Sequence, residues 1–236
     1  MNESIPVLTI IIVYYSRFGV VKRLAQCVAE GARRIEGVVV RELEVEDQPI
    51  EQIRPGETDS GMRRRRAAIL DQLIAADALI VGSPGYFGSM ASPLKRLFED
   101  CATASTPPAT DRSRPWRHFQ FHDKVGAAFT STGTVHGGNE QTIHSILTMF
   151  MHFGMIVVTP GQQQPILEND AAPYGATAIS GADGRQLPSA DEEEEARRQG
   201  QRVAEVASCL KIGSISQHRR GGVRPHLRAR GSDQPT

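Results

Sequence analysis

An uncharged apolar run near the start of the chain, Leu8–Tyr15, limits the available folds more than any other feature. It is rich in Ile, Val and Tyr and does not alternate between polar and apolar residues, which is typical of a central parallel strand covered on both faces. Only residues 16–19 separate it from a second segment, Val20–Arg34, in which apolar residues recur at helical spacing. The turn between them is therefore predicted to lie at the carboxyl end of a buried strand.

This turn has the composition of a phosphate-binding loop. The first turn of a helix has unpaired backbone N–H groups and the positive end of the helix dipole, and both favour a bound anion. Ser16 adds a hydroxyl, and Gly19 permits close approach of a ligand to the backbone. An ordinary strand-to-helix turn capped by Ser16 explains the same residues, so the turn alone leaves both interpretations open.

Strand-like and helix-like segments alternate along the rest of the chain, which predicts an α/β protein with a doubly wound parallel sheet and helices on both faces. Five strands are predicted, at Leu8–Tyr15, Val38–Val45, Ala78–Val81, Val125–Ser131 and Met155–Thr159. Helices are predicted at Val20–Arg34, from the Arg63–Arg66 run to Ala76, at Pro93–Thr103 after Ser92, at Glu140–Phe153 and at Asp191–Leu210 after Ser189. Ala104–Asp123 resembles an insertion, and Gly161–Ala190 is a long loop expected to cover a site or a subunit contact.

The composition indicates one globular domain, residues 1–212, followed by a basic tail, residues 213–236, that is predicted to be disordered. Lys plus Arg equals Asp plus Glu, at 27 each, so no overall field favours nucleic acid or a membrane surface. The arginines of the tail lack interleaved aromatic residues, which argues against a nucleic-acid partner.

The cysteines and the N-terminus predict a cytoplasmic protein without a metal site. Cys27, Cys101 and Cys209 are far apart and form no CxxC pair, which argues against a disulfide framework or a zinc site and fits a reducing compartment. The apolar run at the N-terminus is too short for a membrane span and lacks the flanks of a signal peptide.

Three loops follow predicted strands at the edge of the sheet where ligands bind in open α/β folds. Residues 16–21 form the phosphate-binding turn, residues 82–90 place Tyr86 and Phe87 among three glycines, and residues 130–139 combine hydroxyl groups with glycines. A planar heteroaromatic ring with a phosphate chain suits all three loops, so FMN is the expected ligand. The chain has neither a GxGxxG sequence after its first strand nor a GxxxxGK[ST] or GxSxG motif, which disfavours a simple NAD-dependent dehydrogenase, a P-loop NTPase and a hydrolase.

From about Val7 to Lys211 the chain resembles the WrbA-type NAD(P)H:quinone oxidoreductases of the flavodoxin-like family. The resemblance is carried by VYYSRFG, GSPGYFGSM, STGTVHGGNEQT, MHFGM, APYGATAISGADG and ARRQGQRVAE. It implies a five-stranded parallel sheet in the order 2-1-3-4-5, noncovalent FMN, a homotetramer built as a dimer of dimers, and two-electron reduction of quinones by NADH or NADPH.

The resemblance also implies roles for individual residues. Those expected to contact FMN are Ser16, Arg17, Phe18, Gly19, Val20, Val21, Pro84, Gly85, Tyr86, Phe87, Ser131, Thr132, Gly133, Thr134, Val135, His136 and His152. His152 is the expected catalytic group beside the flavin pyrimidine edge, and Phe18 and Trp116 are the expected substrate contacts. Tyr86 stands where the family commonly has an arginine, Val20 replaces a usual histidine, and Gly85 replaces a hydroxyl residue.

Other interpretations of these residues remain open. His152 is also explained as a partner of the helix C-terminus, and Trp116 as a surface contact of the neighbouring arginines. Phe18 and Phe87 are also explained as anchors that pack on the sheet edge. At the level of function, a flavodoxin-type electron carrier without its own substrate is the main alternative, although the neutral charge and the two extra segments favour an enzyme. A regulatory binding protein that acts through the basic tail is a third class.

Overall fold

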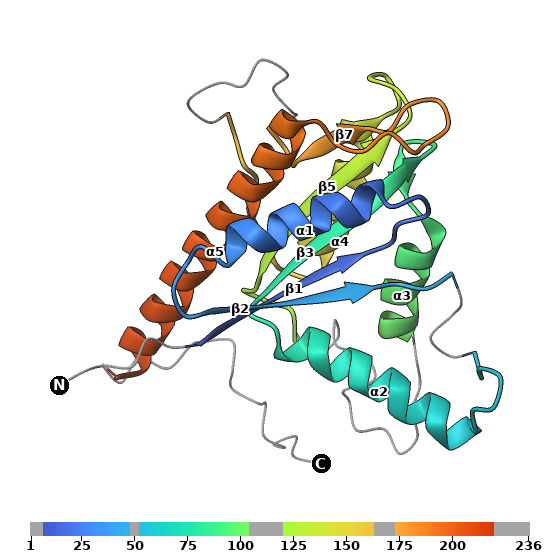
Figure 1. The fold of residues 1–236 in the computed structure, drawn as a ribbon. Helices are drawn as coiled ribbons and strands as arrows, with labels where there is room; N and C mark the ends of the chain where they lie inside the picture. Colours follow the sequence, from blue (N-terminus) through green and yellow to red (C-terminus); the bar gives the residue numbers. More distant parts are fainter. Residues whose placement is uncertain (1–6, 48–51, 104–119, 163–172, 220–236) are drawn as a thin grey trace, which may run out of the picture.

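The computed structural model describes residues 7–47, 52–103, 120–162 and 173–219. Its sheet has β1 (Leu8–Tyr14) near the centre, paired in parallel with β2 (Val38–Glu44) and β3 (Ala78–Tyr86) (Figure 1). β3 pairs in parallel with β5 (Val125–Thr132), and β5 pairs in parallel with β6 (Ile156–Val157). The main path is therefore β2-β1-β3-β5-β6. Because β5 and β6 are the fourth and fifth strands of the prediction, the predicted order 2-1-3-4-5 is confirmed.

Two short strands were not predicted. β4 (Ser89–Met90) turns back antiparallel on the end of β3. β7 (Thr177–Ile179) pairs in parallel with the end of β5, while β6 pairs only with the start of β5. The prediction of one continuous fifth strand at Met155–Thr159, followed by an irregular segment, is thus wrong in part. β7 escapes detection because it is very short and lies in a Gly- and Ala-rich segment, and only its pairing with β5 defines it.

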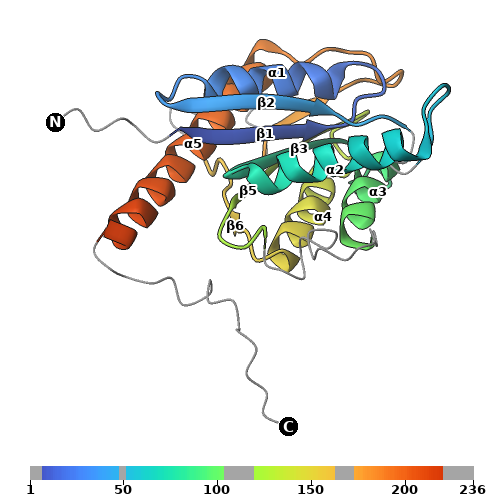
Figure 2. The same ribbon diagram turned by 90° about the horizontal axis from the view of Figure 1, so that it is seen from below.

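Helices cover both faces of the sheet. α1 (Val20–Ala32) and α5 (Ala190–Arg219) lie on one face, and α2 (Asp59–Ala75), α3 (Ser92–Thr103) and α4 (Asn139–His152) lie on the other. Figure 2 shows α1 on one side of the sheet and α2, α3 and α4 on the opposite side. Each face of the sheet has its own hydrophobic core. Ile10 and Ile12 of β1 pack in the core beneath α1 and α5, and Ile11 and Val13 pack in the core beneath α2, α3 and α4. All four side chains are at most 1% exposed. The apolar run is therefore a strand buried on both faces, as predicted.

A close crossing holds α1 against α5. A Cβ on Gly31 would lie 1.8 Å from the carbonyl oxygen of Arg197, and one on Gly200 would lie 2.0 Å from that of Val28. The Arg23 guanidinium donates to Glu193, and the Arg197 guanidinium donates to Glu30. The crossing therefore depends on glycine in both helices, and it fixes the position of α1 and of the turn that precedes it.

α5 runs further than the sequence predicts. It continues to Arg219, past Gly213, where the disordered tail was expected to begin. Near its end, the Lys211 ammonium donates to the Val7 carbonyl and to the Asp77 carboxylate, each at 2.6 Å, which attaches the helix to the start of the sheet. Residues 220–236 lie outside the described part of the chain. Among the described helices, none is both long and apolar enough to cross a membrane.

Candidate functional site

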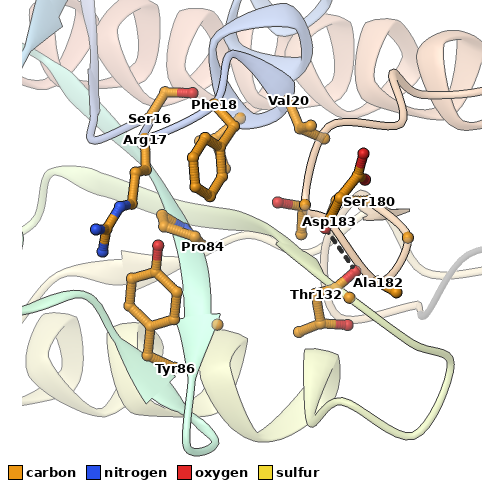
Figure 3. Close-up of a pocket in the computed structure, with 16 residues that line it drawn as sticks. Ser16, Arg17, Phe18, Val20, Pro84, Tyr86, Thr132, Ser180, Ala182 and Asp183 are labelled. Carbon is orange, nitrogen blue, oxygen red and sulfur yellow. Dashed lines mark hydrogen bonds between the residues drawn. The ribbon is translucent and has the colours of Figure 1, made fainter.

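A cavity of about 270 Å³ lies at the carboxyl edge of the sheet, between the loops that follow β1, β3, β5 and β7 (Figure 3). The predicted site residues that line it are Ser16, Arg17, Phe18, Val20, Val21, Pro84, Gly85, Tyr86, Ser131, Thr132 and Gly133. Residues 180–184 complete the lining. The three loops that the sequence singles out therefore meet at one site, together with a fourth segment.

The turn after β1 presents unpaired donors. Gly19 precedes α1 with a φ of 94°, a conformation that favours glycine. The Ser16 hydroxyl oxygen accepts hydrogen bonds from the N–H groups of Gly19 and Lys22, both at 3.1 Å. Within the described part of the chain, the N–H groups of Phe18, Val20 and Val21 make no hydrogen bond. The turn thus combines a preformed shape with free N–H groups at a helix N-terminus, which is the chemistry that binds a phosphate.

The strand beneath this turn is held by two tyrosines. The Tyr14 hydroxyl lies 3.4 Å from a carboxylate oxygen of Glu44, and the Tyr15 hydroxyl donates to Asp47 at 3.1 Å. Burial, followed by the charges of Glu44 and Glu42, raises the pKa of Tyr14 to about 12. Burial and the hydrogen bond to Asp47 also raise the pKa of Tyr15. Both side chains therefore stay neutral at physiological pH and tie the end of β1 to the end of β2.

The β3–β4 hairpin forms a second wall. A Cβ on Gly85 would lie 2.6 Å from both Thr132 Cγ2 and Thr142 Oγ1, so only glycine fits between the hairpin and its neighbours. Tyr86 and Phe18 point into the same space from β3 and from the turn after β1 (Figure 3). Phe87 has a φ of 53° and is fully exposed. It does not line the cavity.

The segment from the end of β5 into the following loop divides into two parts. Ser131 and Thr132 are buried and, with Gly133, line the cavity. The Thr132 hydroxyl donates to the Thr134 carbonyl at 2.8 Å, which turns the loop. Beyond this turn, residues 134–136 are exposed and do not line the cavity. Only the first half of the predicted contact loop therefore meets the site.

Residues 180–184 belong to the long loop that was expected to cover a site or a subunit contact, but none of them was among the predicted contacts. The Ser180 N–H donates to the Thr132 carbonyl at 2.8 Å, and its hydroxyl donates to the same oxygen at 3.1 Å (Figure 3). Gly181 and Gly184 have φ values of 74° and 73° and bracket a tight turn. A Cβ on Gly184 would lie 3.0 Å from the Phe18 ring, so this backbone packs against the aromatic side chain. The available signal was the GADG sequence, whose two glycines suit a tight turn.

His152, the predicted catalytic residue, lies far from the cavity within one chain. α4 begins beside the cavity, where Thr142 lies next to Gly85, and it runs for 14 residues. At 1.5 Å per residue, its last residue, His152, lies about 20 Å from the start of α4 along the helix axis. His152 is also exposed. Trp116 lies outside the described residues.

The cavity contains few groups that could themselves perform acid–base chemistry. Of the residues that line it, only Arg17, Tyr86 and Asp183 are titratable. No nucleophile is paired with a base among them, because Ser16 accepts backbone hydrogen bonds and Ser180 donates to a carbonyl. Such a site is suited to holding a group that supplies the chemistry itself.

The sheet order and a donor-rich turn at its carboxyl edge define a flavodoxin-like α/β protein. In this class the fold agrees with a WrbA-like flavodoxin from Agrobacterium tumefaciens, at a TM-score of 0.58 and 24% identity over 86% of this chain and 99% of that one. A flavodoxin from the domain Archaea aligns at a TM-score of 0.51 and 22% identity over 85% and 99% of the two chains. The chain belongs to the NADPH-dependent FMN reductase family, whose family model matches residues 10–164.

Curated relatives extend this similarity over most of the chain. A protein named NAD(P)H dehydrogenase (quinone) from Rhodopseudomonas palustris strain BisA53 is 38% identical over 206 residues, which cover 85% of this chain and 98% of the relative. A protein of the same name from Acidovorax ebreus strain TPSY is also 38% identical, over 85% of this chain and 97% of its own length.

Proposed function

We propose that this protein uses noncovalently bound FMN to transfer two electrons from NADH or NADPH to a quinone, which leaves as a hydroquinone. Relatives at 36–38% identity are named NAD(P)H dehydrogenase (quinone), which supports the proposal. The observation that carries the proposal is the turn after β1, whose free N–H groups open onto a cavity without its own catalytic pair. FMN accepts a hydride and returns two electrons, which is the chemistry that these side chains lack.

The turn would hold the FMN phosphate. The N–H groups of Phe18, Val20 and Val21 are the available donors, and the α1 dipole favours the negative charge. The Ser16 hydroxyl preserves the shape of the turn by accepting from Gly19 and Lys22. The free N–H groups and the fixed shape of the turn support the proposal that it holds a phosphate monoester.

The remaining walls would hold the ring system and the substrates. Pro84, Gly85 and Tyr86 lie on one side of the cavity, and Ser131, Thr132 and Gly133 lie on another. Phe18 and Tyr86 present aromatic surface toward the open side, where the nicotinamide and the quinone would stack in turn. Sharing one position predicts ping-pong kinetics, because the oxidised nucleotide has to leave before the quinone can bind.

The proposal includes a homotetramer, a dimer of dimers, in the cytoplasm. His152 stands at the far end of α4, so its proposed contact with FMN requires another copy of the chain. Exposed Phe87 and Val135 are apolar surface near the mouth of the cavity that a second copy could cover. The proposed FMN contacts of Phe87, Thr134, Val135 and His136 would then form in the assembly. Trp116 remains a proposed substrate contact. The FMN-binding domain remains proposed as residues 1–212 and the basic tail as residues 213–236, of which the first seven continue α5.

An anaerobic titration in one cuvette tests the activity. Purified protein loaded with FMN is mixed with NADH or NADPH, and the flavin absorbance near 450 nm is followed before benzoquinone is added. Bleaching by the nucleotide and prompt recovery with one equivalent of quinone are expected. If FMN binds and neither nucleotide bleaches it, the protein is an electron carrier of the flavodoxin type instead.

A further inference from the structure

Two guanidinium groups lie near the aromatic ring of Phe18, a residue that lines the cavity. The Arg17 guanidinium carbon is 5.6 Å from the ring centroid, and that of Arg185 is 5.1 Å from it. Phe18 is 45% exposed, and the Gly184 backbone packs against its ring. Two positive charges from distant parts of the sequence are thus brought to one exposed aromatic side chain.

These two charges are not neutralised by carboxylates. Within the described part of the chain, the side-chain nitrogens of Arg17 and Arg185 make no ion pair and no hydrogen bond. By contrast, Arg23 and Arg63 each pair with a carboxylate. Asp183 is the one acidic residue that lines the cavity, and its carboxylate accepts the backbone N–H of Arg185 at 3.1 Å. Near Phe18 and the cavity, two guanidinium charges therefore outnumber the one carboxylate of the lining.

Stacking on an aromatic ring prepares a guanidinium group to bind an anion. A guanidinium group attracted to a ring in this way keeps N–H donors at the edge of its plane that a ligand can use. Those donors match the oxygens of a phosphate, which they can bind in pairs. The ring also limits the motion of both side chains, which reduces the entropy lost when a ligand binds.

We propose that Arg17 and Arg185 bind the phosphate groups of the nicotinamide dinucleotide donor and thereby select a dinucleotide over a simple dihydronicotinamide. This inference rests on the proposed function. The FMN phosphate has its own N–H donors in the turn after β1. The diphosphate of NADH or NADPH needs further cations near the same cavity. Phe18 then joins the two sites, because it faces the nicotinamide position and carries both guanidinium groups.

The test uses the full-length, FMN-loaded protein and three donors: NADPH, NADH and N-benzyl-1,4-dihydronicotinamide, which has no phosphate. The variant is Arg185→Gln, and the control is Arg41→Gln, which removes the same charge from an exposed position within β2. Arg185→Gln should raise the KM for NADPH and for NADH roughly tenfold and leave the KM for the phosphate-free donor close to its wild-type value. The kcat with NADPH should remain nearly unchanged. Arg41→Gln should leave the ratio between donors at its wild-type value.

A binding measurement provides a second readout that does not depend on turnover. Calorimetry with ADP-ribose, which carries the diphosphate without nicotinamide, should detect binding to the wild type that weakens roughly tenfold in Arg185→Gln. Arg185→Lys should restore part of the affinity, because it returns the charge without the planar donors. Arg17→Gln should weaken ADP-ribose binding as well, and its FMN affinity is measured in parallel because Arg17 adjoins the phosphate turn.

Three outcomes would overturn the inference. The first is an equal rise in KM for all three donors, which would mean that Arg185 only positions Phe18. The second is a weaker FMN affinity with unchanged ADP-ribose binding, which would assign the charges to the FMN phosphate. The third is no change in any of these values. Failure of the proposed function is distinguishable, since the wild type would then oxidise none of the three donors, including the one without phosphate.

Discussion

The crossing of α1 and α5 makes Gly200→Ala a direct test of the packing that positions the phosphate turn. The new Cβ would lie 2.0 Å from the Val28 carbonyl oxygen, whereas nonbonded atoms prefer about 3.5–4.0 Å. The obstacle is backbone rather than the end of a flexible side chain, so the two helices have to separate by roughly 1.5 Å. Every contact along the crossing would loosen as they do.

Two opposing free-energy terms set the expected size of the effect. Alanine is favoured over glycine within a helix by about 1 kcal/mol. Overpacking a close contact costs about 1–3 kcal/mol, and the upper end applies because backbone atoms cannot rotate away. Gly200→Ala should therefore lower the free energy of unfolding by about 2 kcal/mol. With an m-value of about 2 kcal/mol per molar urea, the urea midpoint falls by about 1 M.

Gly213→Ala is the matched control, because it makes the same change in the same helix. A Cβ at Gly213 meets nothing within 4 Å, so only the helix-propensity gain, up to about 1 kcal/mol, should remain. The two variants are thus expected to change the urea midpoint in opposite directions. If Gly200→Ala raises the midpoint as Gly213→Ala does, at an unchanged m-value, the close approach of the two helices is refuted.

Further predictions concern the turn and two titrating groups. Ser16→Ala removes the acceptor of two N–H groups and should weaken FMN binding at least fivefold by fluorescence titration, while Ser16→Thr should retain most of the affinity. The Arg65 guanidinium lowers the pKa of Glu57 to about 2, so the stabilisation from this pair should be complete above pH 4.5 and be lost as the pH falls toward 2. The urea midpoints of the wild type and of Glu57→Gln should therefore converge as the pH falls over that range. A constant difference between the two midpoints would contradict this prediction. Burial lowers the pKa of Lys124 to about 8, so between pH 8 and 10.5 the unfolded chain binds more protons than the folded chain. The free energy of unfolding should therefore rise with pH across this window in the wild type but not in Lys124→Met. Identical slopes in the two proteins would count against a buried ammonium group.

Those parts of the fold that depend on local sequence could be predicted. β1 was predictable because a fully apolar run has to be covered on both faces, and the turn after it because Ser16 and Gly19 leave few other conformations. The cavity lining in the loops after β1, β3 and β5 followed, since the carboxyl ends of parallel strands meet at one edge.

Features that depend on distant contacts could not be predicted in the same way. Residues 180–184 reach the cavity only because β7 pairs with the end of β5, and neither the length nor the composition of β7 indicates a strand. The last turns of α5 extend beyond Gly213, next to the attachment of Lys211 to Val7 and Asp77, which lie far away in the sequence. The position of His152 followed from the length of α4, yet its proposed role depends on copies of the chain that a single sequence does not place.

The central claim is that the turn at residues 16–21 binds the phosphate of FMN. The most direct measurement compares the dissociation constants of FMN and riboflavin for the same apoprotein, because the two ligands differ only in that phosphate. With several charge-assisted hydrogen bonds from the turn, FMN should bind at least about 100-fold more tightly than riboflavin. Equal affinities would show that the turn does not hold the phosphate and would contradict the account.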